Sequence, residues 1–130
     1  MLEFKELMAQ TADRLGFENG LEPDEDGICE IISEEADIVI MDCPDADETV
    51  LVTAKLMDAP PGRDEALLAA LKANHRFAAT KGASISLDEE NNSLALSVYR
   101  PLASLDGDKM VALLEDFSST LLSLRQALSA

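Results

Sequence analysis

The sequence predicts an α+β fold, with helices packed on an antiparallel sheet in the order α-β-β-β-α-β-β-α. Helical periodicity marks three segments of the chain, and strand-like apolar runs stand in a group of three and a group of two. The connections within each group are short, which is typical of neighbouring antiparallel strands. Because the 130 residues contain no evident linker or repeat, we expect one domain spanning residues 1–130.

The first half of the chain predicts one helix and three strands. Residues 2–15 form an amphipathic helix, and Gly16 follows where a helix C-cap favours glycine. The strands are expected at 28–33, 36–42 and 49–57, joined by polar turns. Both faces of the second strand are apolar, unlike a sheet with one face in water. We therefore expect either helices on both sides of the sheet, or one side kept apolar for a partner.

The second helix is expected at 64–80, and it is apolar on nearly every side. One stripe contains three leucines with Asn74 and His75, and a second stripe consists of alanines and Phe77. A sheet that covered the first stripe would leave the alanine stripe bare, so we expect a second copy of the chain to cover it. We expect Asn74 and His75 to cap a buried loop or strand through hydrogen bonds. The predicted dimer interface comprises Ala66, Ala70, Ala73 and Phe77.

The last third of the chain predicts a hairpin and a closing helix. The hairpin strands are expected at 83–87 and 93–98, around an acidic turn in which Asn92 and its neighbour tolerate left-handed backbone. The closing helix begins near Asp106 and carries a continuous apolar stripe, which indicates an ordinary core-facing surface.

Charge and composition exclude several classes of function. Ten basic and 26 acidic residues give a net charge of −16, which disfavours binding to nucleic acid and to anionic membranes. No apolar run reaches membrane-spanning length, and the N-terminus lacks the features of a signal peptide, so we expect a cytoplasmic protein without membrane insertion. In that compartment Cys29 and Cys43 are expected to remain reduced.

No motif predicts catalysis, a metal site or a cofactor, and we expect none of the three. The run from Asp24 to Gly27 resembles the start of a calcium loop, but Ser33 stands where the bidentate glutamate is required. That run is better explained as a solvated turn. His75 is the only histidine, and the chain has no nucleophile elbow, phosphate loop, CxxC or HExxH motif.

Four stretches carry a resemblance to a known family. They are the opening helix ending LGF, the sequence DEDGICEI from Asp24, the long LLAALKANHRFAATKGASISLDEENNSLALS stretch from Leu67, and the closing LASLDGDKMVALLEDFSSTLLSLRQAL helix from Leu102. In their order and spacing they resemble class I type III secretion chaperones of the Tir-chaperone (CesT-like) family. The resemblance covers almost the whole chain.

This resemblance implies a homodimer that binds an extended, non-globular segment near the N-terminus of a secreted effector. It implies that the segment is kept unfolded and protected from aggregation until delivery, without chemistry, nucleotide or metal. Family effectors contact apolar patches in the first helix and the first three strands. The predicted effector-binding residues are Phe4, Leu7, Met8, Ile38, Ile40, Val50 and Val52. The alternative interpretation is that half of these residues, those on the inward side, simply pack beneath the second and third helices.

Two alternatives stay open at this point. One is a chaperone-like regulator that sequesters a transcriptional control protein of the secretion system. The other is a small enzyme with an unrecognised site. A native partner that is not secreted would favour the first, and a pocket of coupled ionisable groups would favour the second.

Overall fold

The structure, a computed structural model, describes residues 2–34, 36–59, 64–75 and 80–129, without the side chains of residues 64, 66 and 129. Its elements follow the predicted order, with one short 3₁₀ helix added before the last helix. They are α1 (Phe4–Leu15), β1 (Ile28–Ile32), β2 (Asp37–Cys43), β3 (Thr49–Asp58), α2 (Asp64–His75), β4 (Ser84–Asp88), β5 (Ser93–Pro101), η1 (Leu102–Ser104) and α4 (Gly107–Ser129). Within the predicted second helix, residues 76–79 lie outside the described residues.

Local sequence explains the ends of α1. At its start the side chains of Glu3 and Glu6 form a capping box with each other's backbone N–H groups. At its end Gly16 has a φ of 75°, the left-handed conformation that glycine adopts without steric cost. The predicted C-cap is confirmed.

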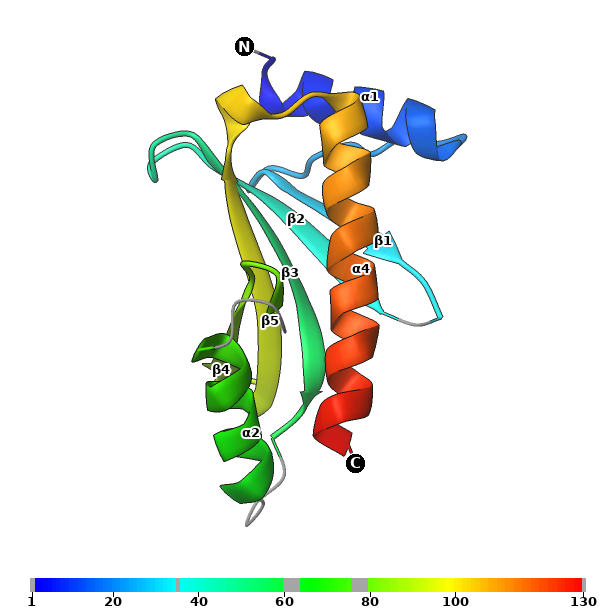
Figure 1. The fold of residues 1–130 in the computed structure, drawn as a ribbon. Coiled ribbons are helices and arrows are strands. Elements are labelled where there is room, and N and C mark those ends of the chain that lie inside the picture. The colour runs from blue at the N-terminus through cyan, green and yellow to red at the C-terminus, as the bar shows by residue number, and fades with distance from the viewer. Residues whose placement is uncertain (1, 35, 60–63, 76–79, 130) are drawn as a thin grey trace.

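The five strands form one antiparallel sheet in the order β1-β2-β3-β5-β4. Figure 1 shows the long strands β3 and β5 side by side in its middle, where they pair from Thr49 opposite Pro101 to Asp58 opposite Ser93. The register shifts between Lys55 and Met57. There Arg125 of α4 donates hydrogen bonds to the carbonyl oxygens of Lys55 and Leu56, at 2.7 and 2.9 Å. The bulge is thereby held against the last helix.

The core lies between one face of the sheet and the helices (Figure 1). α4 crosses this inner face, α1 lies across one end, and α2 lies beside the edge strand β4. The predicted apolar stripe of the last helix is confirmed as core at Met110, Leu114, Phe117, Leu121, Leu124 and Leu128. On the strands, side chains at alternate positions are buried, and the positions between them are half-buried or exposed. In the described part of the chain, no helix covers the outer face.

The junction between α1 and α4 joins the first helix of the chain to the start of the last helix. Arg14 forms an ion pair with Asp108, and the Gly107 N–H donates to the side-chain oxygen of Gln10. A Cβ atom at Gly107 would lie 2.5 Å from a guanidinium nitrogen of Arg14. Only glycine therefore fits here without displacing Arg14.

Candidate binding surfaces

All seven predicted effector-binding residues are buried in the core of the chain. The most exposed of them, Ile38, shows 7% of its surface, and five show none. They come from the buried face of α1 and from the inward positions of β2 and β3, namely Phe4, Leu7, Met8, Ile38, Ile40, Val50 and Val52. A client could reach them only by displacing the elements that cover them. The expectation that such residues pack in the core therefore holds for all seven. Their role in client binding stays a prediction.

The second helix is turned the opposite way from the expectation. Ala70 is 4% exposed and Ala73 is half-buried against the core, whereas Leu68 and Leu71 are 56% and 65% exposed. The expectation that the alanine stripe is bare is therefore wrong at these two positions. Small side chains let a helix approach a strand closely, and Leu68 and Leu71 remain largely exposed to solvent. The side chain of Ala66 and the whole of Phe77 lie outside the described residues.

Asn74 is the residue that this close approach places against the sheet. Its side-chain amide donates to the Ile85 carbonyl oxygen at 2.9 Å and accepts from the Ile85 N–H at 2.7 Å. The predicted capping of a strand is confirmed for Asn74, while His75 is exposed. An amide bonded in this way to both backbone groups of one residue takes the place of a neighbouring strand.

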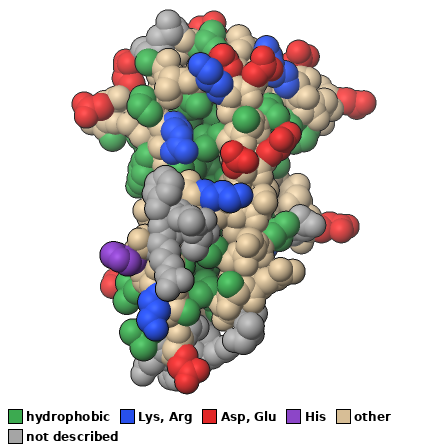
Figure 2. Space-filling view, in the orientation of Figure 1, with side chains coloured by type: hydrophobic (Ala, Val, Ile, Leu, Met, Phe, Trp, Pro, Cys, Tyr) green, Lys and Arg blue, Asp and Glu red, His purple; other side chains and the backbone are tan. Residues whose placement is uncertain are grey.

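An apolar surface, which we call the leucine patch, lies where α2 meets the β4 edge. Three of its members also line a hollow of about 230 Å³ together with Ala70, Ile85 and Leu94. In Figure 2 hydrophobic side chains reach the surface over α2, at the lower left. Each member of the patch is at least 39% exposed: Leu67, Leu68, Leu71 and Leu87.

A second apolar surface crosses the outer face of the sheet, and sequence reasoning missed it as a unit. Ile28 pairs with Met41, Met41 with Leu51, and Leu51 with Tyr99, so the four side chains form one row across four strands. We call it the outer row. Tyr99 is 59% exposed and the other three are half-buried. Alternation along each strand was visible in the sequence, but the row depends on the pairing register.

Further along the outer face the surface becomes polar and hollow. A depression of about 540 Å³ is lined by Glu30, Asp37, Thr53 and Lys55, among others. Thr53 bonds the hydroxyl of Ser97 at 2.8 Å, and Lys55 forms an ion pair with Asp58. The outer face thus offers an apolar row beside a depression with exposed carboxylates.

The β1–β2 side of the molecule is strongly acidic. Residues 15–54 contain 13 of the 26 acidic residues and no lysine or arginine. Burial, Asp24 and Glu22 together raise the pKa of the Cys29 thiol to about 11. Burial and the nearby Glu48 raise the pKa of Asp42. On the face seen in Figure 2, acidic side chains gather in the upper half. The negative electrostatic potential of these carboxylates favours cationic partners.

The turn before β1 is shaped by Asp24. One carboxylate oxygen accepts the N–H groups of Asp26 and Ile28, at 2.9 and 3.0 Å. Gly27 has a φ of 75°. The predicted turn is confirmed. Within the described ranges, no three His, Cys, Asp or Glu side chains converge as a metal site would require.

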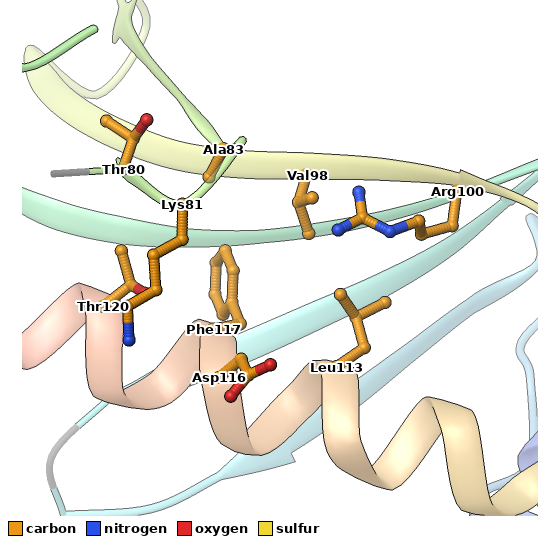
Figure 3. A pocket seen from close by; sticks show the side chains of 9 residues that line it. All are labelled: Thr80, Lys81, Ala83, Val98, Arg100, Leu113, Asp116, Phe117 and Thr120. Carbon is orange, nitrogen blue, oxygen red and sulfur yellow. The ribbon is translucent and has the colours of Figure 1, made fainter. Parts of the chain in front are cut away.

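A pocket between β5 and α4 is too small for a substrate. Figure 3 shows Lys81 and Arg100 approaching it with Asp116 and Phe117 of α4. Its volume is about 60 Å³, whereas ligand pockets hold about 300 Å³ or more. The space suits one or two water molecules.

Comparison with known proteins identifies the family. The model of the Tir chaperone protein (CesT) family matches residues 6–125. The chain belongs to the CesT family. The resemblance drawn from the sequence motifs is confirmed. No curated protein matches the chain at a significant level of sequence similarity.

Solved structures share the CesT-family fold of this chain. A chain in the HopA1–SchA chaperone–effector complex is 21% identical, with a TM-score of 0.71 and coverage of 96% of this chain and 91% of that one. A chain in the complex of the Yersinia pestis type III secretion chaperone SycH with a stable fragment of YscM2 is 15% identical, with a TM-score of 0.72 and coverage of 94% and 99%.

The same fold occurs in an uncharacterized protein from Methanothermobacter thermautotrophicus. It is 16% identical, with a TM-score of 0.67 and coverage of 98% of this chain and 97% of that one. At these identities the likeness shows the fold alone, and the CesT family match carries the assignment. Among the described residues, none of the helices of this CesT-family chain is both long and apolar enough to cross a membrane.

Proposed function

We propose that this protein is a type III secretion chaperone that binds an extended, non-globular N-terminal segment of a secreted effector. It keeps the segment competent for secretion and prevents its aggregation in the bacterial cytoplasm, without enzymatic activity. The observation that carries the proposal is CesT family membership over residues 6–125. The structural relatives support it, because they include a chaperone–effector complex and a type III secretion chaperone.

The open outer face of the sheet is the client surface that the geometry favours. A folded monomer rarely leaves a continuous apolar row uncovered unless a partner uses it. The outer row ends at the exposed ring of Tyr99, and an extended segment can lay alternate side chains on such a row. The seven buried residues that the sequence assigned to the client lie on the opposite face of this sheet and on helix α1. They therefore pack beneath the proposed client surface.

We also propose that the protein is a homodimer, and that the leucine patch is its interface. Removing exposed leucines from water contributes about 25 cal/mol per Å² of buried apolar area. The patch lies on α2, the helix first assigned to the interface, but on its leucine side. Because Ala70 is already covered by its own chain, it offers little surface to a second copy.

Co-purification from the native cell, followed by mass spectrometry, tests the proposal. We expect the captured protein to be secreted, and its first residues to suffice for binding. A partner that remains in the cell and controls transcription would instead indicate a chaperone-like regulator.

Paired variants locate the client surface within this experiment. Tyr99→Asp, on the outer row, should leave the protein folded and abolish capture. Ile40→Asp, on the inner face, should unfold it, because an unpaired buried carboxylate costs about 3 kcal/mol or more. Undiminished capture by Tyr99→Asp would exclude the outer row.

A further inference from the structure

Two of the ten basic residues of this acidic chain line the pocket between β5 and α4. Lys81 belongs to the turn before β4, which is closed by a hydrogen bond from the Ala83 N–H to the Thr80 carbonyl oxygen at 3.1 Å. Figure 3 shows the Lys81 side chain extending from this turn toward α4. Arg100 belongs to β5, and in this view the Phe117 ring stands between the two cations.

Neither cation is neutralised by a carboxylate within the described part of the chain. The ion pairs between described residues involve neither Lys81 nor Arg100. Asp116 borders the pocket without pairing with either of them. The Arg100 guanidinium donates to the Tyr99 carbonyl oxygen at 2.9 Å, which uses only one of its donors. The lining of the pocket therefore has a net positive charge.

Two buried threonines line the same pocket. Thr80 and Thr120 are 2% and 3% exposed, and neither hydroxyl bonds another described residue. Thr11, a buried threonine of α1, instead bonds the Leu7 carbonyl oxygen at 2.7 Å. Among the described residues, no side-chain oxygen that is sealed from solvent lacks a partner. The two free hydroxyls therefore reach solvent, and the pocket is the space that both residues line. In Figure 3 Thr120 extends from α4 beside the stem of Lys81.

The pocket has the size of a functional group. Its volume is about 60 Å³, and one water molecule has a share of about 30 Å³ in the liquid. The two oxygens of a carboxylate take roughly the space of two water molecules. A phosphate group, with its additional oxygens, needs more room. Size and charge together favour a carboxylate.

We propose that this pocket binds the carboxylate of an aspartate or glutamate side chain of a partner protein. Lys81 and Arg100 supply the opposite charge, and the Thr120 hydroxyl donates a hydrogen bond to the charged group. Asp116 opposes binding by like-charge repulsion. The pocket lies on the helix side of the sheet, whereas the outer row lies on the other face. The inference is therefore independent of the proposed client surface.

Two synthetic peptides test the preferred charge. Each has blocked ends and a single glutamate or glutamine among glycines and serines. The titrations use an ionic strength of about 0.15 M, where a screening length of about 8 Å weakens repulsion by distant carboxylates. The glutamate peptide should bind about fivefold more tightly, with amide shifts at Thr80, Lys81 and Thr120. Equal affinities, or shifts confined to other residues, would overturn the proposal.

Two charge variants at the pocket should act in opposite directions. Lys81→Gln should abolish the preference for the glutamate peptide. Asp116→Asn should tighten binding of that peptide about fivefold, because it removes a repulsive charge. Lys109→Gln and Glu115→Gln make the same charge changes at exposed positions of α4 outside the pocket, and should leave the affinity unchanged. If each variant behaves like its control, only the net charge matters and the proposal is wrong.

A threonine variant separates binding from packing. Thr120→Val removes the hydroxyl without breaking a hydrogen bond within the described chain, so the melting temperature should stay the same. The glutamate peptide should bind this variant about fivefold more weakly. Thr11→Val is the matched control: it removes the bond to Leu7 and should lower the melting temperature without changing peptide affinity. Full affinity of Thr120→Val would exclude the hydroxyl from the site.

Free anions distinguish a partner's side chain from a small solute. Acetate should displace the glutamate peptide only at concentrations above that of the peptide, because the glutamate stem can also contact the apolar lining at Val98 and Leu113. Tighter binding of acetate than of the peptide would assign the site to a free carboxylate and exclude the partner protein. Displacement by inorganic phosphate at lower concentrations than acetate would identify a phosphate site and overturn the proposal. The chaperone function stands or falls separately, with capture of the client.

Discussion

At the scale of single residues, Asn74 connects a helix to a strand that begins ten positions later. An asparagine on an apolar helix stripe predicts a hydrogen-bonded cap, and its amide bonds both backbone groups of Ile85. In this position it satisfies an edge strand that would otherwise offer two open groups to another chain.

Asn74→Ala should reduce the free energy of unfolding by about 1–3 kcal/mol, because it leaves two half-buried backbone groups without partners. Urea denaturation measures the loss, and hydrogen exchange at the Ile85 amide should accelerate. Asn19→Ala, in an exposed loop, is the control and should change stability by less than about 0.5 kcal/mol. A similarly small effect at Asn74 would show that solvent replaces both bonds.

Cys29 predicts a specific dependence of stability on pH. Its pKa is raised from 9.0 to about 11 in the folded protein, so above pH 9 the unfolded chain loses this proton first. Stability should therefore fall as pH rises from about 9 to about 11, and be unaffected by this group below that range. Cys29→Ala should flatten the fall in denaturant titrations. Identical slopes for both proteins would assign the fall to other groups.

At the scale of elements, α2 presents its alanines to its own sheet and its leucines to the outside. Both stripes are apolar, so periodicity alone identified two candidate faces. The short alanine side chains allow the backbone of α2 to come within reach of the Asn74 amide. The exposed leucine patch is then available for a second copy.

Two substitutions on α2 should have opposite outcomes. Leu71→Glu should give a folded monomer, because it places a charge in the proposed dimer interface. Ala70→Glu should instead destabilise the chain itself, because the position is 4% exposed within one copy. Light scattering and thermal melting measure both. Tyr99→Glu, on the outer row, is the control and should remain a dimer. A dimer of Leu71→Glu would remove the leucine patch from the interface.

At the scale of the whole molecule, charge is distributed unevenly. The net charge is −16, so the carboxylates repel one another in the compact state. Residues 15–54, which include β1 and β2, contain no lysine or arginine to offset their share of this charge. The same field that weakens the fold attracts a basic client, so stability and client binding should respond to salt in opposite directions.

Raising the ionic strength from about 0.01 M to about 0.15 M shortens the screening length from about 30 Å to about 8 Å. The melting temperature should rise, and the affinity for an extended peptide that carries a lysine should fall. Calorimetry and peptide titration in the same buffers measure the two effects. The same peptide with glutamate in place of the lysine is the control, because its affinity should not fall. Parallel changes for both peptides would exclude electrostatic recognition.

The sequence by itself determined the element order, the family, the cap on α1, the strand-capping role of Asn74 and the core stripe of α4. These depend on local periodicity and turn chemistry, which are written in neighbouring residues. Only the tertiary structure decided which faces are buried. Ile40 and Met41 are both apolar, and packing against the helices selected Ile40 for the core. The outer row arises from pairing between distant strands, as between Leu51 and Tyr99. That register is set by how the whole sheet buries its inner face, because a shift of one residue would turn every inward side chain outward.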